Sequence, residues 1–295
     1  MTSAKLRAHS FAKINLALSV LGRRADGYHD IQTIFQSIDL SDDLEFQDAP
    51  QLHFQCDNLP DVRPEDNLVW KAANLFISKL DKKRGVSITL KKRIPAGAGL
   101  GGGSSNAAVT LLALRRFWQI DMPDSDLASL AEDLGSDVPF FLNGGTALGV
   151  GRGEQIHLLP DILPEHVVVI FPGIHISTAE AYRSLNLGLT SATEDHRIQR
   201  FCGHVQGGKR CLTGIFNDFE VTILAAYPPV LEAKSFLDAR GAIASLLSGS
   251  GSSVFGFFPS EESTFAAARG AVREAWRVFP AKTLSRAEYL QNTFG

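Results

Sequence analysis

The most unusual stretch of the chain is "PAGAGLGGGSSNAA", Pro95 to Ala108, which holds five glycines, two serines and almost no bulky side chain. Each ordered glycine costs about 0.5–1 kcal/mol of backbone entropy relative to alanine, so this concentration needs a physical reason. A loop without Cβ atoms that leads into a helix points free N–H groups and the positive end of the helix dipole at one place. Ser104 and Ser105 add hydroxyl groups suited to phosphate or Mg²⁺. The stretch therefore predicts a phosphate site and favours a nucleotide as its ligand.

Other glycine-rich motifs fit this stretch less well. Gly97, Gly99 and Gly102 have the GxGxxG spacing of a dinucleotide site, and Asp121 follows at about the expected distance of 20 residues. The preceding strand, however, ends in "KKRIP" rather than in a buried apolar run, and no second strand ends before Asp121. Walker A needs a lysine where Gly103 stands, and the protein kinase loop needs a valine two residues beyond its last glycine. A plain tight turn is the structural alternative, which five glycines in seven positions argue against.

Two charged residues far from this loop could take part in acid–base chemistry. Asp137 follows a helix-ending Leu-Gly pair and precedes Val138-Pro139, which places it in a non-helical turn. It could act as a general base, although capping a turn is the commoner role of aspartate there. Because an isolated aspartate is a weak base, positioning would have to supply much of the rate. Lys13 shares a strand face with Asn15, where lysines usually extend to solvent.

The first elements along the chain that position these residues are expected to be strands. From Ala8 to Val20 the even positions are small or apolar, which predicts a half-buried strand with Lys13 and Asn15 opposite the core. Further strands are expected at "IQTIFQSIDL", "DDLEFQD", "QLHFQCD" and "GVSITLKKRIP", and a hairpin at "GGTALGVGRGEQIHLL". Helices are expected at "NLVWKAANLFISKLDKKRG", at "DSDLASLAEDLG" and at "SSNAAVTLLALRRFW", the last with its serines as the N-cap.

The segment "PDILPEH" predicts a boundary between two domains, residues 1–159 and 160–295, in keeping with the chain length. After it we expect a strand at "HVVVIF", helices at "TAEAYRSL" and "PPVLEAKSFLDARG", one long strand at "AIASLLSGSGSSVFGFF", a helix at "EESTFAAARGAVREAW" and a last strand at "RVFPAKTLS". This alternation predicts a small α+β layer. The stretch "DHRIQRFCGHVQGGKRCL" is weakly amphipathic and is expected to be partly loop.

Composition excludes several classes of partner. The 295 residues include 29 basic and 32 acidic ones, so the net charge of −3 gives no reason to expect nucleic acid. No apolar run approaches the ~20 residues of a membrane span or forms a signal peptide, so we expect no membrane contact and a cytoplasmic location. Three cysteines without CxxC spacing, Cys56, Cys202 and Cys211, fit reduced thiols. Apart from His29, considered below, the histidines show no metal-ligand spacing.

Three stretches together resemble the motifs of the GHMP kinases. The glycine stretch is similar to that family's phosphate-binding motif, "AKINLAL" to its first motif, and "LSGSGSSVFGFF", Leu247 to Phe258, to its third. They occur in the family's order and span nearly the whole chain. Four further stretches resemble those members of the family that act on CDP-methylerythritol. They are "AKINLALSVLGRRADGYHDIQTIFQSIDL", "EDNLVWKAANLF", "LGSDVPFFL" and "FNDFE".

The resemblance implies an α+β fold of two domains, an N-terminal one like ribosomal protein S5 domain 2 and a ferredoxin-like C-terminal one, with the active site in the cleft between them. It implies ATP-dependent phosphorylation of the 2-hydroxyl of CDP-methylerythritol in non-mevalonate (MEP) isoprenoid precursor synthesis, with ATP and Mg²⁺ as cofactors. A kinase for another alcohol, such as homoserine or mevalonate, is the alternative. A nucleotide-binding module without catalysis is a third hypothesis, which the presence of Lys13 and Asp137 argues against. A monomer or weak homodimer is expected.

The resemblance also implies a role for individual residues, with Asp137 as the catalytic base and Lys13 keeping it ionised. No residue is expected to be a dedicated metal ligand. The ATP-binding residues that it implies are Pro95, Gly97, Gly99, Leu100, Gly101, Gly102, Gly103, Ser104, Ser105 and Asn67. Lys91, Lys92 and Arg93 stay open as a further nucleotide contact.

Substrate binding is implied for Asn15, Tyr28, His29, Thr178, Tyr182 and Asn217. Tyr28 and Tyr182 are expected to stack on the two faces of cytosine, and His29 to hydrogen-bond its edge. Tyr182 fits a core position of an amphipathic helix nearly as well. Gly249 and Gly251 are expected to pack against the glycine loop rather than to touch phosphate.

Overall fold

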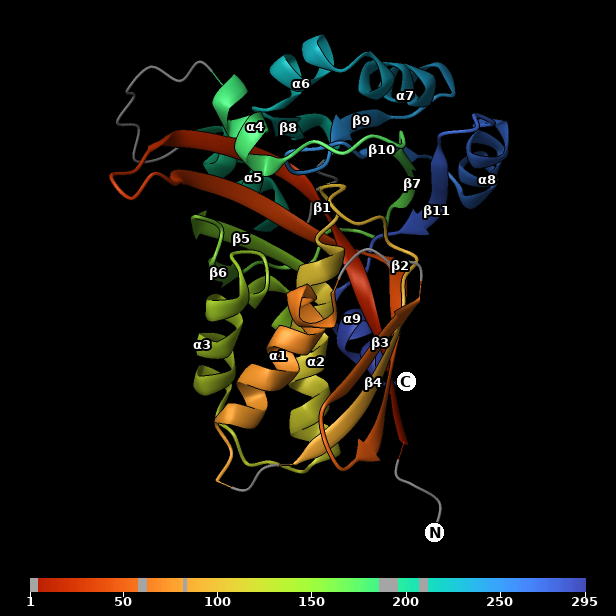
Figure 1. Cartoon of the computed structure of the whole chain (residues 1–295). Coiled ribbons are helices and arrows are strands. Elements are labelled where there is room, and N and C mark those ends of the chain that lie inside the picture. Colours follow the sequence, from red (N-terminus) through yellow and green to blue (C-terminus); the bar gives the residue numbers. More distant parts are fainter. Residues whose placement is uncertain (1–4, 58–62, 82–83, 186–195, 207–211) are drawn as a thin grey trace.

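The chain folds into two β-sheets with helices on their outer faces (Figure 1). The computed structural model describes residues 5–57, 63–81, 84–185, 196–206 and 212–295. This mixture of helices and sheets confirms the expected α+β class. None of the helices in that part of the chain has the length and apolar character that a membrane span needs.

The first sheet is built on one very long antiparallel pair, β1 (Lys5–Arg23) and β2 (His29–Ala49). The strand order is β3-β4-β2-β1-β8, and β5 pairs with β2 and with β6. β2 is long enough to hold both β4 and β5 along the edge that β1 leaves open, each on a different half. The bounds of the other strands are β3 His53–Asp57, β4 Gly85–Lys91, β5 Thr146–Gly151, β6 Gln155–Leu158 and β8 Phe216–Asn217.

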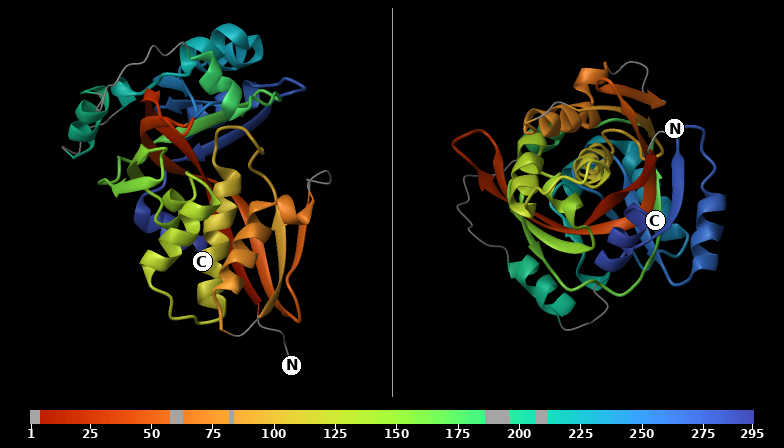
Figure 2. Two further views of the ribbon diagram at one scale, coloured as in Figure 1. Left: turned by 60° about the vertical axis from the view of Figure 1, so that its left-hand side comes forward. Right: turned by 90° about the horizontal axis from the view of Figure 1, so that it is seen from below.

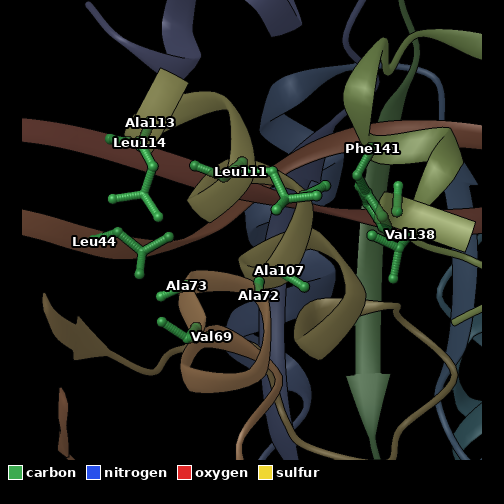
Figure 3. Packing of buried hydrophobic residues seen from close by; sticks show 14 of the residues in the cluster. Leu44, Val69, Ala72, Ala73, Ala107, Leu111, Ala113, Leu114, Val138 and Phe141 are labelled. Carbon is green, nitrogen blue, oxygen red and sulfur yellow. The ribbon is translucent and has the colours of Figure 1, made fainter. Parts of the chain in front are cut away.

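Three helices cover one face of this sheet: α1 (Leu68–Ser78), α2 (Gly102–Phe117) and α3 (Asp124–Leu134). α2 is seen almost end-on near the middle of the right-hand view of Figure 2, with strands and helices around it. Its residues are apolar or small on nearly all sides, as expected of a helix buried within a core. In Figure 3, Leu111 and Leu114 of α2 lie among side chains from α1, β2 and the turn before β5.

The second sheet is antiparallel, with strand order β11-β7-β10-β9, and helices α6, α7 and α8 pack on one of its faces. Its elements are β7 His166–Phe171, α6 Glu220–Ala226, α7 Pro228–Ala239, β9 Ala244–Leu247, β10 Val254–Phe258, α8 Glu261–Gly270 and β11 Arg277–Lys282. Alternate residues of β7 face the helices (Val168, Ile170) and the first sheet (Val167, Val169). Burial on both faces explains why residues 167–171, "VVVIF", are all apolar.

Several expectations about the second half need correction. The stretch expected as one long strand is the hairpin of β9 and β10, and the loop between them carries the third motif. The helix expected at residues 261–276 ends at Gly270. α4 (Thr178–Ser184) was anticipated, and α5 (His196–Gln206) forms the described helical part of the amphipathic stretch. Cys56 and Cys202 are free thiols, and Cys211 lies outside the described residues.

The last helix, α9 (Arg286–Thr293), was not anticipated, although Ser285 and Glu288 form a capping box at its start. It returns to the first core, where Tyr289 is fully buried and its hydroxyl donates to the carbonyl oxygen of Phe141 at 2.6 Å. β8 likewise joins β1 in the first sheet. Segments that follow residue 160 therefore complete the first sheet and its core.

A buried carboxylate fixes the entry to the glycine loop. Asp42 of β2 is fully buried and pairs with Lys92. It also accepts hydrogen bonds from the backbone N–H groups of Arg93 (2.6 Å) and Ile94 (2.8 Å) and from the side chain of Asn106 in α2 (2.9 Å). Because the loop begins and ends among these residues, Asp42 holds both of its ends to β2.

Replacing Asp42 by alanine should destabilise the protein by about 3–5 kcal/mol, because it leaves the Lys92 ammonium group buried without its partner. Chemical denaturation of the two proteins would measure this difference. Asp66→Ala, which breaks an exposed pair with Arg63, is the matched control and should leave the midpoint nearly unchanged. Equal midpoints for all three proteins would contradict the role given to Asp42.

Candidate active site

The glycine loop lies at one side of a cavity of about 1200 Å³, which is also lined by β1, β2, the turn before β5, α4 and the third-motif loop, residues 248–253. α2 begins at Gly102, and its N-cap is Gly101 with φ of 68°, so the expected serine cap is wrong. The first turn of α2 therefore reaches into the glycine run itself and opens toward the cavity. The structure thus places a helix N-terminus with bare backbone at the cavity wall, as the sequence predicted.

The glycines are bare for two different reasons. Gly99, at φ 77°, has no room for a side chain, because a Cβ atom would collide with the carbonyl oxygen of Ser248 in the third-motif loop. A Cβ atom on Gly101 would lie 2.7 Å from the ring of Phe141, and one on Gly102 would lie 2.8 Å from Ile94. On Gly103, by contrast, it would meet only Leu68, at 3.5 Å. Packing thus explains Gly99, Gly101 and Gly102, whereas a Cβ atom on Gly103 would make only an ordinary van der Waals contact.

The two loops are also joined by hydrogen bonds. The Ser248 hydroxyl donates to the carbonyl oxygen of Gly99 at 2.9 Å, and the N–H of Ser253 donates to that of Ala98 at 3.1 Å. A Cβ atom on Gly249 would lie 3.3 Å from the Gly99 oxygen. The expected packing of the third motif on the glycine loop is therefore observed for Gly249. The carbonyl oxygen of Gly251 also lies beside the glycine loop, 3.1 Å from the position of a Cβ atom on Gly99. Gly249 and Gly251 also line the cavity.

The residues expected to bind ATP are not all at the cavity. Pro95, Gly97, Gly99, Gly101, Gly102, Gly103 and Ser104 line it. Ser105 is fully buried and does not, because successive helical residues point about 100° apart, so its expected place at the mouth is corrected. Leu100 is buried in the core between the two sheets, and its carbonyl oxygen accepts from the N–H of Lys13. Asn67 caps α1 through the N–H of Val69, beside the cavity-lining Leu68.

Lys13 and Asp137 meet inside the cavity, with 3.5 Å between Nζ and Oδ2. Lys13 is only 3% exposed, so the expectation of a half-buried strand with its polar face toward solvent is wrong. The glycine loop and the third-motif loop cover that face, whereas the second sheet packs on the opposite face of β1, against Ala12 and Ile14. The Lys13 ammonium group also donates to Asn15 at 2.7 Å. Asn15 in turn donates to Thr33 at 2.8 Å, which fixes the amide with its oxygen toward Lys13.

The strand β1 presents these residues through an irregular register. Lys13 and Asn15 point into the cavity, but the next cavity residue on β1 is Leu18 rather than residue 17. A register shift between Asn15 and Ala17 exchanges the two faces at this point. Asp137 comes from the turn between α3 and the 3-10 helix Pro139–Leu142, and its side chain is 34% exposed. One wall thus carries a buried ammonium group, and a solvent-accessible carboxylate faces it.

The far end of the cavity is aromatic. His29 and Tyr182 stack with ring centroids 4.5 Å apart and 13° between the planes, and Phe219 lies edge-on to Tyr182 at 4.9 Å. Tyr28 lies at the rim, 56% exposed, with the guanidinium group of Arg152 over its ring. Burial, together with the charge of Arg23, lowers the pKa of His29, which favours the neutral ring. Burial also raises the pKa of the Tyr182 hydroxyl, with a smaller contribution from Asp137.

Two residues expected to bind the substrate have different surroundings. Thr178 lines the cavity, with its hydroxyl 3.3 Å from that of Ser250. Asn217 does not line it; its amide donates to the carbonyl oxygens of Leu247 and Gly249 at 2.8 Å and holds the third-motif loop. None of the basic residues from Lys91 to Arg93 lines the cavity, and Lys92 is engaged by Asp42.

Sequence reasoning missed some of the cavity residues. Thr33 and Ser136 gave no signal, because isolated hydroxyl residues are common in strands and turns. Arg23 and Arg152 line the cavity as well. Arg152 had a detectable signal, since it stands between two glycines at the turn of the predicted hairpin "GGTALGVGRGEQIHLL".

Comparisons with known proteins agree with this architecture. Residues 67–145 match the family described as GHMP kinases N terminal domain, and residues 211–278 match GHMP kinases C terminal. The chain belongs to the GHMP kinase family and is an ATP-dependent small-molecule kinase.

The relatives within that family carry a more particular name. A 4-diphosphocytidyl-2-C-methyl-D-erythritol kinase of Solibacter usitatus (strain Ellin6076) is 42% identical over 268 residues, which are 90% of this chain and 84% of the relative. A crystal structure of 4-(cytidine 5'-diphospho)-2C-methyl-D-erythritol kinase is 35% identical, with a TM-score of 0.81 over 94% of this chain and 99% of that one. A homoserine kinase from Cytophaga hutchinsonii has a TM-score of 0.70 over 97% and 96% of the two chains, but at 16% identity it shares only the fold.

The two kinds of glycine give a test of the phosphate site. Gly103→Ala adds a methyl group at the cavity wall that would make only an ordinary contact with Leu68, so the fold should keep its thermal stability. The KM for ATP should rise by about tenfold, or ~1.4 kcal/mol, because that methyl group occupies the approach to the backbone N–H groups. Steady-state kinetics and a melting curve would measure both quantities.

Gly99→Ala is the matched variant at a packing glycine. It should lower the melting temperature, because the collision with Ser248 separates the two loops. An unchanged KM for ATP in Gly103→Ala would argue that phosphate does not approach this part of the loop.

Proposed function

We propose that the chain transfers the γ-phosphoryl group of ATP to the 2-hydroxyl of 4-diphosphocytidyl-2-C-methyl-D-erythritol, a step of non-mevalonate isoprenoid precursor synthesis. The observation that carries the proposal is the Lys13–Asp137 pair, which lies in one cavity between a glycine-rich helix start and an aromatic cluster. The first feature suits a polyphosphate, and the second suits a nucleobase. The names of the relatives supply the substrate.

Asp137 is the base in this proposal. Its carboxylate accepts the hydroxyl proton while the acceptor oxygen forms a bond to the γ-phosphorus and the bond from that phosphorus to the β-phosphate oxygen breaks, releasing ADP. The ammonium group of Lys13 keeps the carboxylate ionised. It has three N–H donors, of which Asn15 and Asp137 face two. No other described residue accepts from this group, so the third donor can bind an oxygen of the transferred group.

The backbone N–H groups of residues 101–104 hold the phosphates in this scheme. Among the described residues no three His, Cys, Asp or Glu side chains gather so that they could bind a metal ion by themselves. The hydroxyl of Ser104 and the carboxylate of Asp137 are nevertheless oxygen donors in the lining. Such a lining fits a Mg²⁺ ion bound mainly by ATP and water, with Ser104 as a contact from the chain. The ion would neutralise charge on the phosphates.

Tyr28, His29 and Tyr182 are proposed to bind cytosine. The neutral ring of His29 can both donate and accept a hydrogen bond at the base edge. Since Tyr182 stacks on His29 rather than facing Tyr28, cytosine would have to displace that stack or bind on Tyr28 beside it. Homoserine and mevalonate have no base and would leave this cluster without a ligand, which favours the CDP-linked substrate over the alternative alcohols.

A coupled assay of ADP release tests the substrate directly. We expect turnover with CDP-methylerythritol and little or none with homoserine or mevalonate at the same concentrations. Turnover on homoserine or mevalonate, with none on CDP-methylerythritol, would overturn the proposed substrate and leave the kinase class standing.

Asp137→Ala should lower kcat by about 10²–10⁴-fold, the usual contribution of a positioned general base, while the affinity for ATP stays close to that of the wild type. Rapid-quench kinetics and calorimetric titration with a non-hydrolysable ATP analogue would measure the two effects. Asp121→Ala, which removes an exposed carboxylate outside the cavity, is the control and should keep full activity. Substantial turnover by Asp137→Ala would remove Asp137 from the role of base.

A further inference from the structure

The cavity is strongly cationic although the chain carries a net charge of −3. Among its described lining residues one carboxylate, Asp137, faces four cations: Lys13, Arg23, Arg152 and Arg183. Lys13 belongs to the glycine-loop end. The three arginines lie with the aromatic cluster: Arg23 is paired across the β1–β2 ladder with His29, Arg152 lies over Tyr28, and Arg183 follows Tyr182 in α4. The positive charge at the aromatic end of the cavity favours the binding of a second anion, in addition to the phosphates of ATP.

Of these three arginines, Arg152 is the one that lies over the ring of Tyr28. It stands in the turn between β5 and β6, where the Glu154 carboxylate accepts from its backbone N–H at 2.6 Å and lies 3.7 Å from its Nε. This pairing engages one edge of the guanidinium group. The two terminal nitrogens donate to no described residue, and the side chain is 34% exposed. A free pair of N–H donors in fork geometry is the arrangement that binds phosphate oxygens in bidentate fashion.

The turn that carries Arg152 also connects the two ends of the proposed substrate site. The guanidinium carbon of Arg152 lies 5.0 Å from the centroid of the Tyr28 ring. On the next residue, a Cβ atom added to Gly153 would lie 4.0 Å from Oδ1 of Asp137. In a CDP-linked alcohol, a diphosphate joins the nucleoside to the alcohol. With the base at Tyr28 and the reacting hydroxyl at Asp137, that diphosphate must pass this turn.

We propose that Arg152 binds the diphosphate of the acceptor substrate and selects for diphosphate-linked over phosphate-free acceptors. This inference rests on the proposed function, because it takes the base to lie at Tyr28 and the hydroxyl at Asp137. The same guanidinium group holds the Tyr28 ring by a cation–π contact. Diphosphate binding and base stacking therefore depend on one side chain, and a ligand with only one of the two groups makes only part of the contacts.

Calorimetric titration of cytidine and of CDP tests this role, with ADP at saturating concentration so that the glycine-loop site is filled. In Arg152→Gln the affinity for CDP should fall by about tenfold, ~1.4 kcal/mol, while that for cytidine changes by less than about threefold. In turnover, the KM for CDP-methylerythritol should rise by a similar factor, with the KM for ATP unchanged. Arg152→Lys keeps the charge but loses the fork, and should recover only part of the CDP affinity.

Arg240→Gln is the matched control, because Arg240 lies over the Phe236 ring at the same 5.0 Å but outside the cavity, and it should behave as the wild type. Equal losses of cytidine and CDP affinity in Arg152→Gln, or a parallel rise in the KM for ATP, would overturn the proposal. Absence of wild-type turnover on CDP-methylerythritol would instead overturn the proposed function, and the ratio of CDP to cytidine affinity would still report whether Arg152 binds a diphosphate.

Discussion

A buried ammonium ion in the middle of the longest strand pair is the constraint on which the site depends. Lys13 is 3% exposed, and a charge in such a place is stable only with partners at close range. Asn15 and Asp137 are those partners, and Thr33 fixes the orientation of Asn15. The N–H of Lys13 also holds Leu100, so the same residue ties the glycine loop to β1. One residue thus sets the relative positions of the phosphate cradle and the base.

The sequence predicted most of the chemistry because that chemistry is local. A glycine-rich helix start can be recognised from a stretch of 14 residues. Lys13 and Asp137, which lie in the same cavity, can be recognised from separate motifs. Helical and strand periodicity located most elements. Ser105 was misplaced because its direction depends on where α2 begins, and the glycines themselves obscured that point.

Other features depended on tertiary contacts that periodicity does not record. The burial of Lys13 comes from the glycine loop and the third-motif loop, which pack over this part of β1. The register shift beside Asn15 leaves no trace in the pattern of apolar residues. Gly99 must be glycine because Ser248, 149 residues away in the sequence, occupies the space beside it. The role of Arg152 needs three turns to come together, those that carry Tyr28, Asp137 and Arg152 itself.

The position of α9 has a consequence for how the protein is made. Tyr289 is part of the first core, beside Phe141 and against Gly144, whose Cβ position would overlap the tyrosine ring. During synthesis the N-terminal half leaves the ribosome long before this residue does. The core under the glycine loop therefore stays open until α9 has been synthesised, and the nucleotide site cannot be complete before then.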